Sequence, residues 1–168
     1  MKNLITISII ALLLPLALQA QSSGKKTTQD TQQERPHLVV FVVGLRNAPL
    51  SDYLTNLIEN NLSRTYLIIP RTEAVKKKMQ ELKDYEDGGQ VDDRELIEWG
   101  HQHNIQTLCL VTVAHTDEFL FSAQLTDVKT NTLIGNAEYE IPSLTGDDLK
   151  KAASALAGQM QNQLKNRK

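Results

Sequence analysis

The sequence predicts an α/β (α+β) fold, a two-layer sandwich in which helices pack on one face of a mixed five-stranded sheet. The predicted element order is β-α-β-α-α-β-β-β-α. Residues 105–141 supply the first observation, because they contain three strand-like runs joined by two short polar turns. The second observation is that the flanking segments place apolar residues at helical spacing, so they can form the layer that covers the sheet.

The three runs differ in their pattern of apolar residues. Residues 108–114 are apolar almost throughout, which suits a strand that is covered on much of both sides. Residues 119–126 and 132–141 alternate between apolar and polar side chains, which is typical of antiparallel strands with one buried face. In the turn between these two runs, Asn131 can adopt the left-handed conformation.

The chain before this meander contains two further predicted strands. Residues 37–44 form an apolar, β-branched run that predicts a strand inside the sheet, ended by Gly44. A helix is expected over about residues 51–62, with Ser51 as its N-cap. Residues 66–69, which precede a proline, predict the second strand, and a right-handed crossover would make these two strands parallel.

Three more helices are expected from their caps and apolar stripes. One begins near Thr72, one runs from Asp92 or Asp93 to about His103, and the last follows a capping box at Thr145. Their predicted buried stripes are Val75, Met79 and Leu82 for the first; Leu96, Trp99, Gly100 and His103 for the second; and Leu149, Ala153, Leu156, Met160 and Leu164 or Gln163 for the third.

Four residues in this region have specific expected roles. Trp99 should be largely buried between its helix and the sheet, and Gly100 should let the helix backbone lie close to the strands. Asn104 suits a left-handed C-cap. Cys109, the single cysteine, lies in an apolar strand, so it cannot form an internal disulfide and should be a buried, inert thiol.

The amino-terminal residues are not expected to belong to the fold. Residues 1–20 combine a short positive start with an apolar run, which predicts a secretory signal peptide; the alternative is an uncleaved anchor helix. Residues 21–36 are polar and predict a flexible leader. The single α/β domain is therefore expected over residues 37–168, in a periplasmic or secreted protein with no transmembrane segment in its mature chain.

No motif in the chain predicts a catalytic residue, a cofactor site or a metal site. The lysines at residues 76–78 lie among acidic side chains, which cancel the field that a phosphate site needs. The acidic, glycine-centred segment 84–93 lacks the spacing of a calcium-binding loop. His101 and His103 are two residues apart and face different ways on a helix. The net charge of −2 gives no reason to expect nucleic-acid binding.

Three segments resemble a group of periplasmic α/β domains. They are Tyr-Leu-Ile-Ile-Pro-Arg at residues 66–71, Val-Asp-Asp-Arg-Glu-Leu-Ile-Glu-Trp-Gly at residues 91–100, and Phe-Ser-Ala-Gln-Leu-Thr-Asp-Val-Lys-Thr at residues 121–130. The group contains the lipoprotein activators of penicillin-binding proteins, the periplasmic domain of the curli-secretion pore and the amino-terminal domain of TolB. The resemblance covers about residues 37–164.

This resemblance implies a non-catalytic module that binds one or more envelope proteins. Its anchored members carry a lipid-modified cysteine, which this chain lacks. We expect a module linked to peptidoglycan synthesis or outer-membrane assembly; the alternative is a small periplasmic hydrolase or ligand-binding protein with a site at the strand ends. If a partner adds a strand to an open edge, residues 132–141 are the better candidate edge, although Glu138 and Glu140 also suit a guarded edge.

Overall fold

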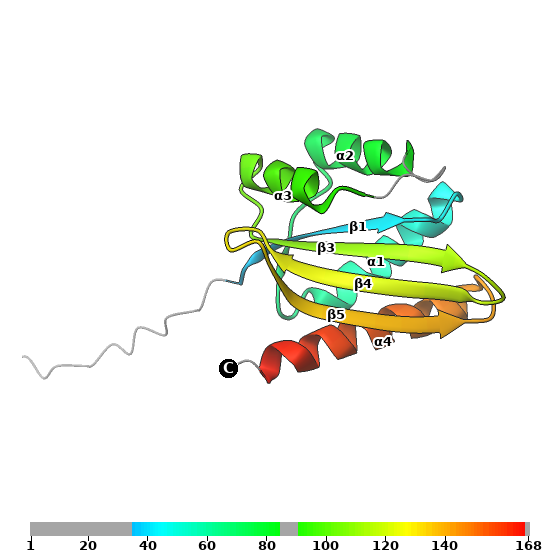
Figure 1. Cartoon of the computed structure of the whole chain (residues 1–168). Helices are drawn as coiled ribbons and strands as arrows, with labels where there is room; N and C mark the ends of the chain where they lie inside the picture. Colours follow the sequence, from blue (N-terminus) through cyan, green and yellow to red (C-terminus); the bar gives the residue numbers. More distant parts are fainter. Residues whose placement is uncertain (1–34, 85–90, 167–168) are drawn as a thin grey trace, which may run out of the picture. The chain divides into compact units, whose positions relative to one another are not determined.

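The computed structural model describes residues 35–84 and 91–166. The predicted signal peptide, all but the end of the predicted leader, and residues 85–90 of the acidic segment lie outside the described residues. The element order predicted from the sequence is confirmed (Figure 1). The elements are β1 (His37–Val43), α1 (Ala48–Leu62), β2 (Leu67–Ile68), α2 (Glu73–Asp84), α3 (Asp93–Gln102), β3 (Thr107–His115), β4 (Phe119–Asp127), β5 (Thr132–Ile141) and α4 (Gly146–Lys165).

The sheet is mixed and five-stranded, as predicted, with the strand order β2-β1-β3-β4-β5. β1 pairs in parallel with both β2 and β3, because the connections to each neighbour pass through helices. β3, β4 and β5 form the predicted antiparallel meander, with a register shift between Leu125 and Thr126. β5 therefore lies at one edge of the sheet, and the two-residue strand β2 lies at the other.

The prediction that all helices pack on one face is wrong. β1 is buried at every position from Leu38 to Val43, and its side chains alternate between two apolar clusters on opposite faces of the sheet. One cluster joins β1 to α1 and α4, and the other joins it to α2 and α3. The physical reason is the continuous apolar run of β1, since a strand of this composition must be covered on both faces.

Most predicted caps are confirmed, but the first helix begins earlier than expected. Asn47 is its N-cap and accepts a hydrogen bond from the Leu50 N–H at 3.2 Å, while Ser51 lies inside the helix and is 1% exposed. The sequence Ala-Pro after Asn47 fits this start, because proline is favoured in the first helical turn. The confirmed caps and left-handed residues are Thr72, Asp92, Asn104, Asn131 and Thr145.

Trp99 is partly buried and packs against the apolar cluster that joins β1 to α2 and α3. Its ring meets the edge of Phe41 at a centroid distance of 5.4 Å and stacks on the exposed His103 at 4.6 Å. Gly100 behaves as predicted: a Cβ atom there would lie 3.2 Å from a Val128 methyl carbon and 3.3 Å from a Leu108 methyl carbon. The close approach of α3 at Gly100 leaves the larger Trp99 side chain at the border of the packed layer, where one ring face is covered by His103 instead of by the core.

Candidate protein-binding surface

Two glutamines of α4 bind the backbone of the edge strand β5. The side chain of Gln163 donates to the Asn136 carbonyl at 2.7 Å and accepts from the Asn136 N–H at 2.9 Å. Gln159 makes the same pair of contacts with Glu138, at 3.0 Å to the carbonyl and 3.4 Å from the N–H. Gln159 and Gln163, hereafter the glutamine pair, thus take the place of a neighbouring strand at these two residues.

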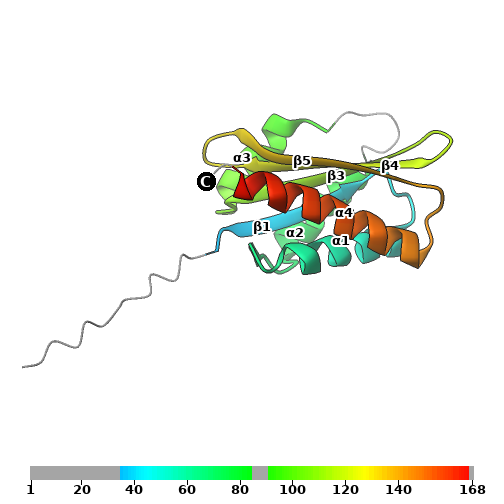
Figure 2. The same ribbon diagram turned by 90° about the horizontal axis from the view of Figure 1, so that it is seen from below.

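Small residues on β5 explain how α4 reaches this edge. Gly135 and Ala137 are buried against the helix, and a Cβ atom at Gly135 would lie 3.7 Å from the Met160 Cβ. The helix consequently runs alongside β5 in both views (Figure 2). Four helical residues rise about 6 Å and two strand residues about 7 Å, so glutamines four apart match every second residue of the strand.

The glutamine pair does not extend to the end of β5. Outward-facing backbone groups recur at every second residue, so the backbone of Glu140 faces the same way as that of Asn136 and Glu138. The matching helical position, four residues before Gln159, is Ala155, whose methyl side chain offers no hydrogen bond. Within residues 35–84 and 91–166, no side chain hydrogen-bonds the backbone of Glu140, so this end of the edge is open.

The face of β4 and β5 that points away from α4 is solvent-facing. We call this surface the open face; its residues are Ser122, Gln124, Asn136, Glu138 and Glu140. Beside it lies a groove of about 300 Å³, in which Leu133, 47% exposed, is the most exposed apolar side chain. The groove is lined by Asp93, Leu96, Ile97, Leu108, Leu110, Gln124, Thr126, Asn131 and Leu133. A groove with both apolar and polar walls, beside a polar sheet surface, can receive the side chains of another protein.

A second cavity, of about 610 Å³, lies where β1 and β3 begin, and it bears on the alternative of a ligand site at the strand ends. It is lined by Arg35, Pro36, Thr65, Tyr66, Gln106, Thr107, Asp127, Lys129, Ile134 and Leu164. Two of its polar groups already serve the fold: the Asp127 carboxylate accepts from the Thr130 N–H and hydroxyl at 2.8 Å each, and Gln106 accepts from the His37 N–H at 2.8 Å. Burial, followed by the charges of Cys109 and Asp127, raises the pKa of Tyr66 to about 12, so this phenol is neutral.

Side chains that often perform chemistry are separated in the structure. Cys109 is 0% exposed, as predicted, and burial raises the pKa of its thiol to about 12, which removes the reactive thiolate at neutral pH. His103 is held by a 2.9 Å contact between its Nδ1 and the Trp99 carbonyl, and His115 stacks on Phe119 at the other end of the sheet. Among the residues that the structure describes, no three His, Cys, Asp or Glu side chains could hold a metal ion.

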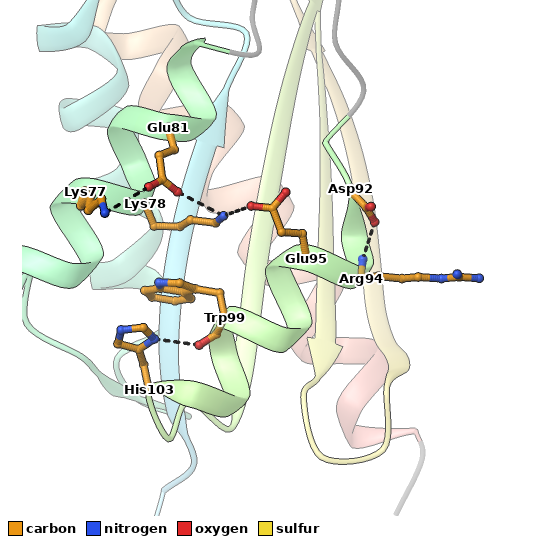
Figure 3. A network of polar contacts seen from close by, with 8 residues as sticks. All are labelled: Lys77, Lys78, Glu81, Asp92, Arg94, Glu95, Trp99 and His103. Atoms are coloured by element: carbon orange, nitrogen blue, oxygen red, sulfur yellow. Dashed lines mark hydrogen bonds and ion pairs between the residues drawn. The ribbon is translucent and has the colours of Figure 1, made fainter.

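Lys78 is buried, although lysine side chains are usually exposed. Its residue is 4% exposed, and its Nζ lies 2.5 Å from Glu95 Oε1 and 3.3 Å from Glu81 Oε2 (Figure 3). Burial lowers the pKa of Lys78, but the hydrogen bonds to Glu95 and Glu81 outweigh this effect and raise it. Lys78 follows Val75 by three residues and precedes Leu82 by four, and this spacing was the available signal that it shares their buried face.

The Lys78 contacts connect α2 to α3 and therefore serve the fold. The ammonium group of Lys78 already donates hydrogen bonds to both carboxylates, so it has little capacity to bind a phosphate.

The glutamine pair is not predicted from the sequence, where Gln163 is expected only as an alternative member of a buried stripe. The signal was present: Gln159 and Gln163 are four residues apart and flank Met160, so they lie together at the margin of the apolar face.

Comparisons with known proteins identify the fold. No model of a known protein family matches the chain, and neither does any curated protein sequence. TolB from Acinetobacter baumannii is similar in structure with a TM-score of 0.53 and 14% identity, over 79% of this chain and 29% of the TolB chain. The chain therefore spans less than a third of TolB.

Two further solved structures are similar at lower scores. One is the dodecamer of a leucine-to-methionine variant of PelC from Paraburkholderia phytofirmans, with a TM-score of 0.42 and 14% identity over 79% of this chain and 90% of that chain. The other is the LpoB C-terminal domain from Salmonella enterica, with a TM-score of 0.48 and 12% identity over 68% of this chain and 87% of that chain. The predicted resemblance to the domain group of TolB is confirmed at the level of the fold.

No helix within the described ranges has both the length and the apolar character needed to cross a bilayer.

Proposed function

We propose that this chain is an exported, non-catalytic protein-binding module of the bacterial cell envelope, linked to peptidoglycan synthesis or outer-membrane assembly. One observation carries the proposal: the open face and the groove at Leu133 form an accessible surface beside an edge strand. Sheet edges and shallow apolar grooves are surfaces on which one protein receives a segment of another. The fold shared with TolB and the resemblance stated above support the envelope as the place where such a partner is met.

The separation of reactive side chains favours binding over hydrolysis. A hydrolase needs a nucleophile, a base and polar groups that converge on one point. In the described part of the chain the thiol is buried, and His103 and His115 lie at different ends of the sheet. Asp127 and Gln106 of the larger cavity form hydrogen bonds within the fold. The signal peptide predicted at residues 1–20 supports a periplasmic or secreted location.

Affinity capture from envelope extracts tests the proposal with a matched pair of variants. Leu133 and Leu67 are the exposed large apolar residues of the described chain, at 47% and 42%, and they lie near opposite sheet edges. Leu133→Asp should abolish capture of envelope proteins, whereas Leu67→Asp should leave it intact, with both variants folded by circular dichroism. Equal capture by both variants, or turnover of a small substrate by purified protein that captures nothing, would contradict the proposal.

A further inference from the structure

We propose that the β5 edge is a selective strand-binding site that takes an extended, lysine- or arginine-rich segment of a partner protein. The segment enters at Glu140 and displaces Gln159 from Glu138. This inference rests on the proposed binding function and deepens it by naming the chemistry of the partner. It concerns the edge itself, whereas the groove at Leu133 belongs to the adjacent face.

The hydrogen bonds of the glutamine pair weaken along β5 in one direction. At Asn136 they measure 2.7 and 2.9 Å, at Glu138 they measure 3.0 and 3.4 Å, and at Glu140 the matching helical residue is Ala155. A longer hydrogen bond is a weaker one. A strand that begins pairing at Glu140 therefore meets an unoccupied backbone first and the weaker of the two glutamines second.

Displacement of Gln159 preserves the number of hydrogen bonds at Glu138. A partner strand supplies one backbone N–H and one carbonyl at each second residue, which replace the amide N–H and carbonyl of the glutamine. The released Gln159 side chain is exposed and bonds water instead. The exchange therefore changes the free energy little at Glu138, and the new backbone hydrogen bonds at Glu140 favour binding of the incoming strand.

The charge of the open face specifies the partner. Glu138 and Glu140 are both exposed and point to the same side of β5, two residues apart. Neither carboxylate forms an ion pair with any residue that the structure describes; Glu138 accepts only a 3.4 Å hydrogen bond from Ser122. Alternate residues of an added strand would lie beside both carboxylates, so cationic side chains at those positions are favoured, by up to about fivefold for each pair.

The same charges disfavour a second copy of this chain as the occupant. Antiparallel pairing of two β5 strands about these residues would place carboxylates beside carboxylates, which is destabilising. The opposite edge of the sheet is a poor site for an added strand, because β2 has only two residues and is followed closely by Pro70. Repulsion of the wrong partner together with attraction of the right one is a common basis of specificity.

A peptide-binding experiment tests this inference with variants that act in opposite directions. The probe is a short capped peptide of alternating lysine and threonine, labelled for fluorescence anisotropy, and an alternating glutamate–threonine peptide is the charge control. Gln159→Met keeps the side-chain length but removes the amide, so it should strengthen binding of the lysine peptide severalfold. Ala155→Gln extends the row of glutamines to Glu140 and should weaken binding severalfold.

Two further variants separate edge binding from general attraction of charges. Ser154→Gln places the same new side chain on the exposed neighbouring position of α4 and should bind as the unaltered protein does. Combined Glu138→Gln and Glu140→Gln should lose most of the binding while leaving the thermal unfolding temperature nearly unchanged, because both residues are exposed.

Three outcomes would overturn the inference. They are equal binding of the lysine peptide by Ala155→Gln and the unaltered protein, equal binding of the lysine and glutamate peptides, and self-association of Gln159→Met without peptide binding. The third outcome would mean that the glutamine pair only protects the edge. If envelope proteins are still captured through Leu133 in any of these cases, the proposed function stands and only the strand-binding inference fails.

Discussion

Gln163 of α4 and Asn136 of β5 are joined by two hydrogen bonds, in which the glutamine amide donates to the asparagine carbonyl at 2.7 Å and accepts from its backbone N–H at 2.9 Å. An edge-strand N–H that faces outward ordinarily exchanges its proton with water. The Asn136 N–H should therefore be protected although β5 is an edge strand.

Gln163→Met should remove this protection. The variant keeps the length of the side chain and loses both hydrogen bonds, so the Asn136 amide should exchange about tenfold faster and the protein should lose about 1 kcal/mol of stability. Hydrogen exchange followed by NMR resolves this single amide. Asn162→Met, at an exposed neighbouring position, is the control; an unchanged Asn136 rate in Gln163→Met would show that the glutamine does not protect the edge.

The buried Lys78 should make stability depend on pH in the alkaline range. Its pKa is raised in the folded protein, so its contribution is fully present below the unfolded value of about 10.4 and is lost as the pH rises through the folded value. Urea unfolding at neutral and alkaline pH measures this loss. Lys78→Met should unfold within about 1 kcal/mol of the unaltered protein at pH 7 and show a smaller alkaline loss.

Lys77→Met is the matched control for Lys78, because the Lys77 side chain is 80% exposed. Its stability should follow the pH profile of the unaltered protein. Identical alkaline profiles for Lys78→Met and the unaltered protein would mean that the contacts with Glu81 and Glu95 add nothing to stability.

Cys109 should not react in the folded protein. Burial raises the pKa of its thiol to about 12, and the reactive species is the thiolate. A thiol reagent should label the protein only as fast as it unfolds, and Cys109→Ala should cost on the order of 1 kcal/mol or more through lost packing. Rapid labelling at neutral pH, without denaturant, would contradict the central position of β3.

Trp99 should report its half-buried position in both fluorescence and stability. Emission should lie between that of a buried tryptophan and that of tryptophan in water. Trp99→Ala should destabilise the protein by less than the about 3–5 kcal/mol that is typical of a fully buried tryptophan, because His103 covers one face of the ring and the core only its edge. A loss at the upper end of that range would show that the side chain carries more of the packing than its exposure indicates.

The sequence predicted the features that depend on residues close together in the chain. The alternation in β4 and in β5 from Gly135 onward, the caps at Asp92 and Thr145, and the left-handed Asn131 follow from local chemistry, and the structure confirms them. The start of β5 departs from the alternation, because the register shift opposite Leu125 and Thr126 leaves Leu133 exposed and packs Ile134 against the core. The prediction of Ser51 as the N-cap is wrong because serine, aspartate and asparagine all cap helices, and Pro49 favours the earlier start after Asn47.

The features that sequence reasoning missed depend on contacts between distant elements. The continuous apolar run of β1 did indicate two covered faces, yet it does not say which helices cover them. The glutamine pair reaches β5 only because Gly135 and Ala137, more than twenty residues earlier, let α4 approach. Lys78 contacts Glu95 only because α2 and α3 pack side by side on the same face of the sheet. The sequence around Lys78 therefore does not predict Glu95 as its partner.

The proposed binding function is tested most directly by photo-crosslinking in intact cells. A photoreactive residue at Leu133, beside the open face, should capture envelope proteins that mass spectrometry identifies, while one at Lys150, an exposed residue of α4 whose side chain is 58% accessible, should not. Addition of Glu138→Lys to the Leu133 probe should reduce the capture without unfolding the protein. Absence of any captured envelope protein at Leu133, or the same captured proteins at Lys150, would contradict the account.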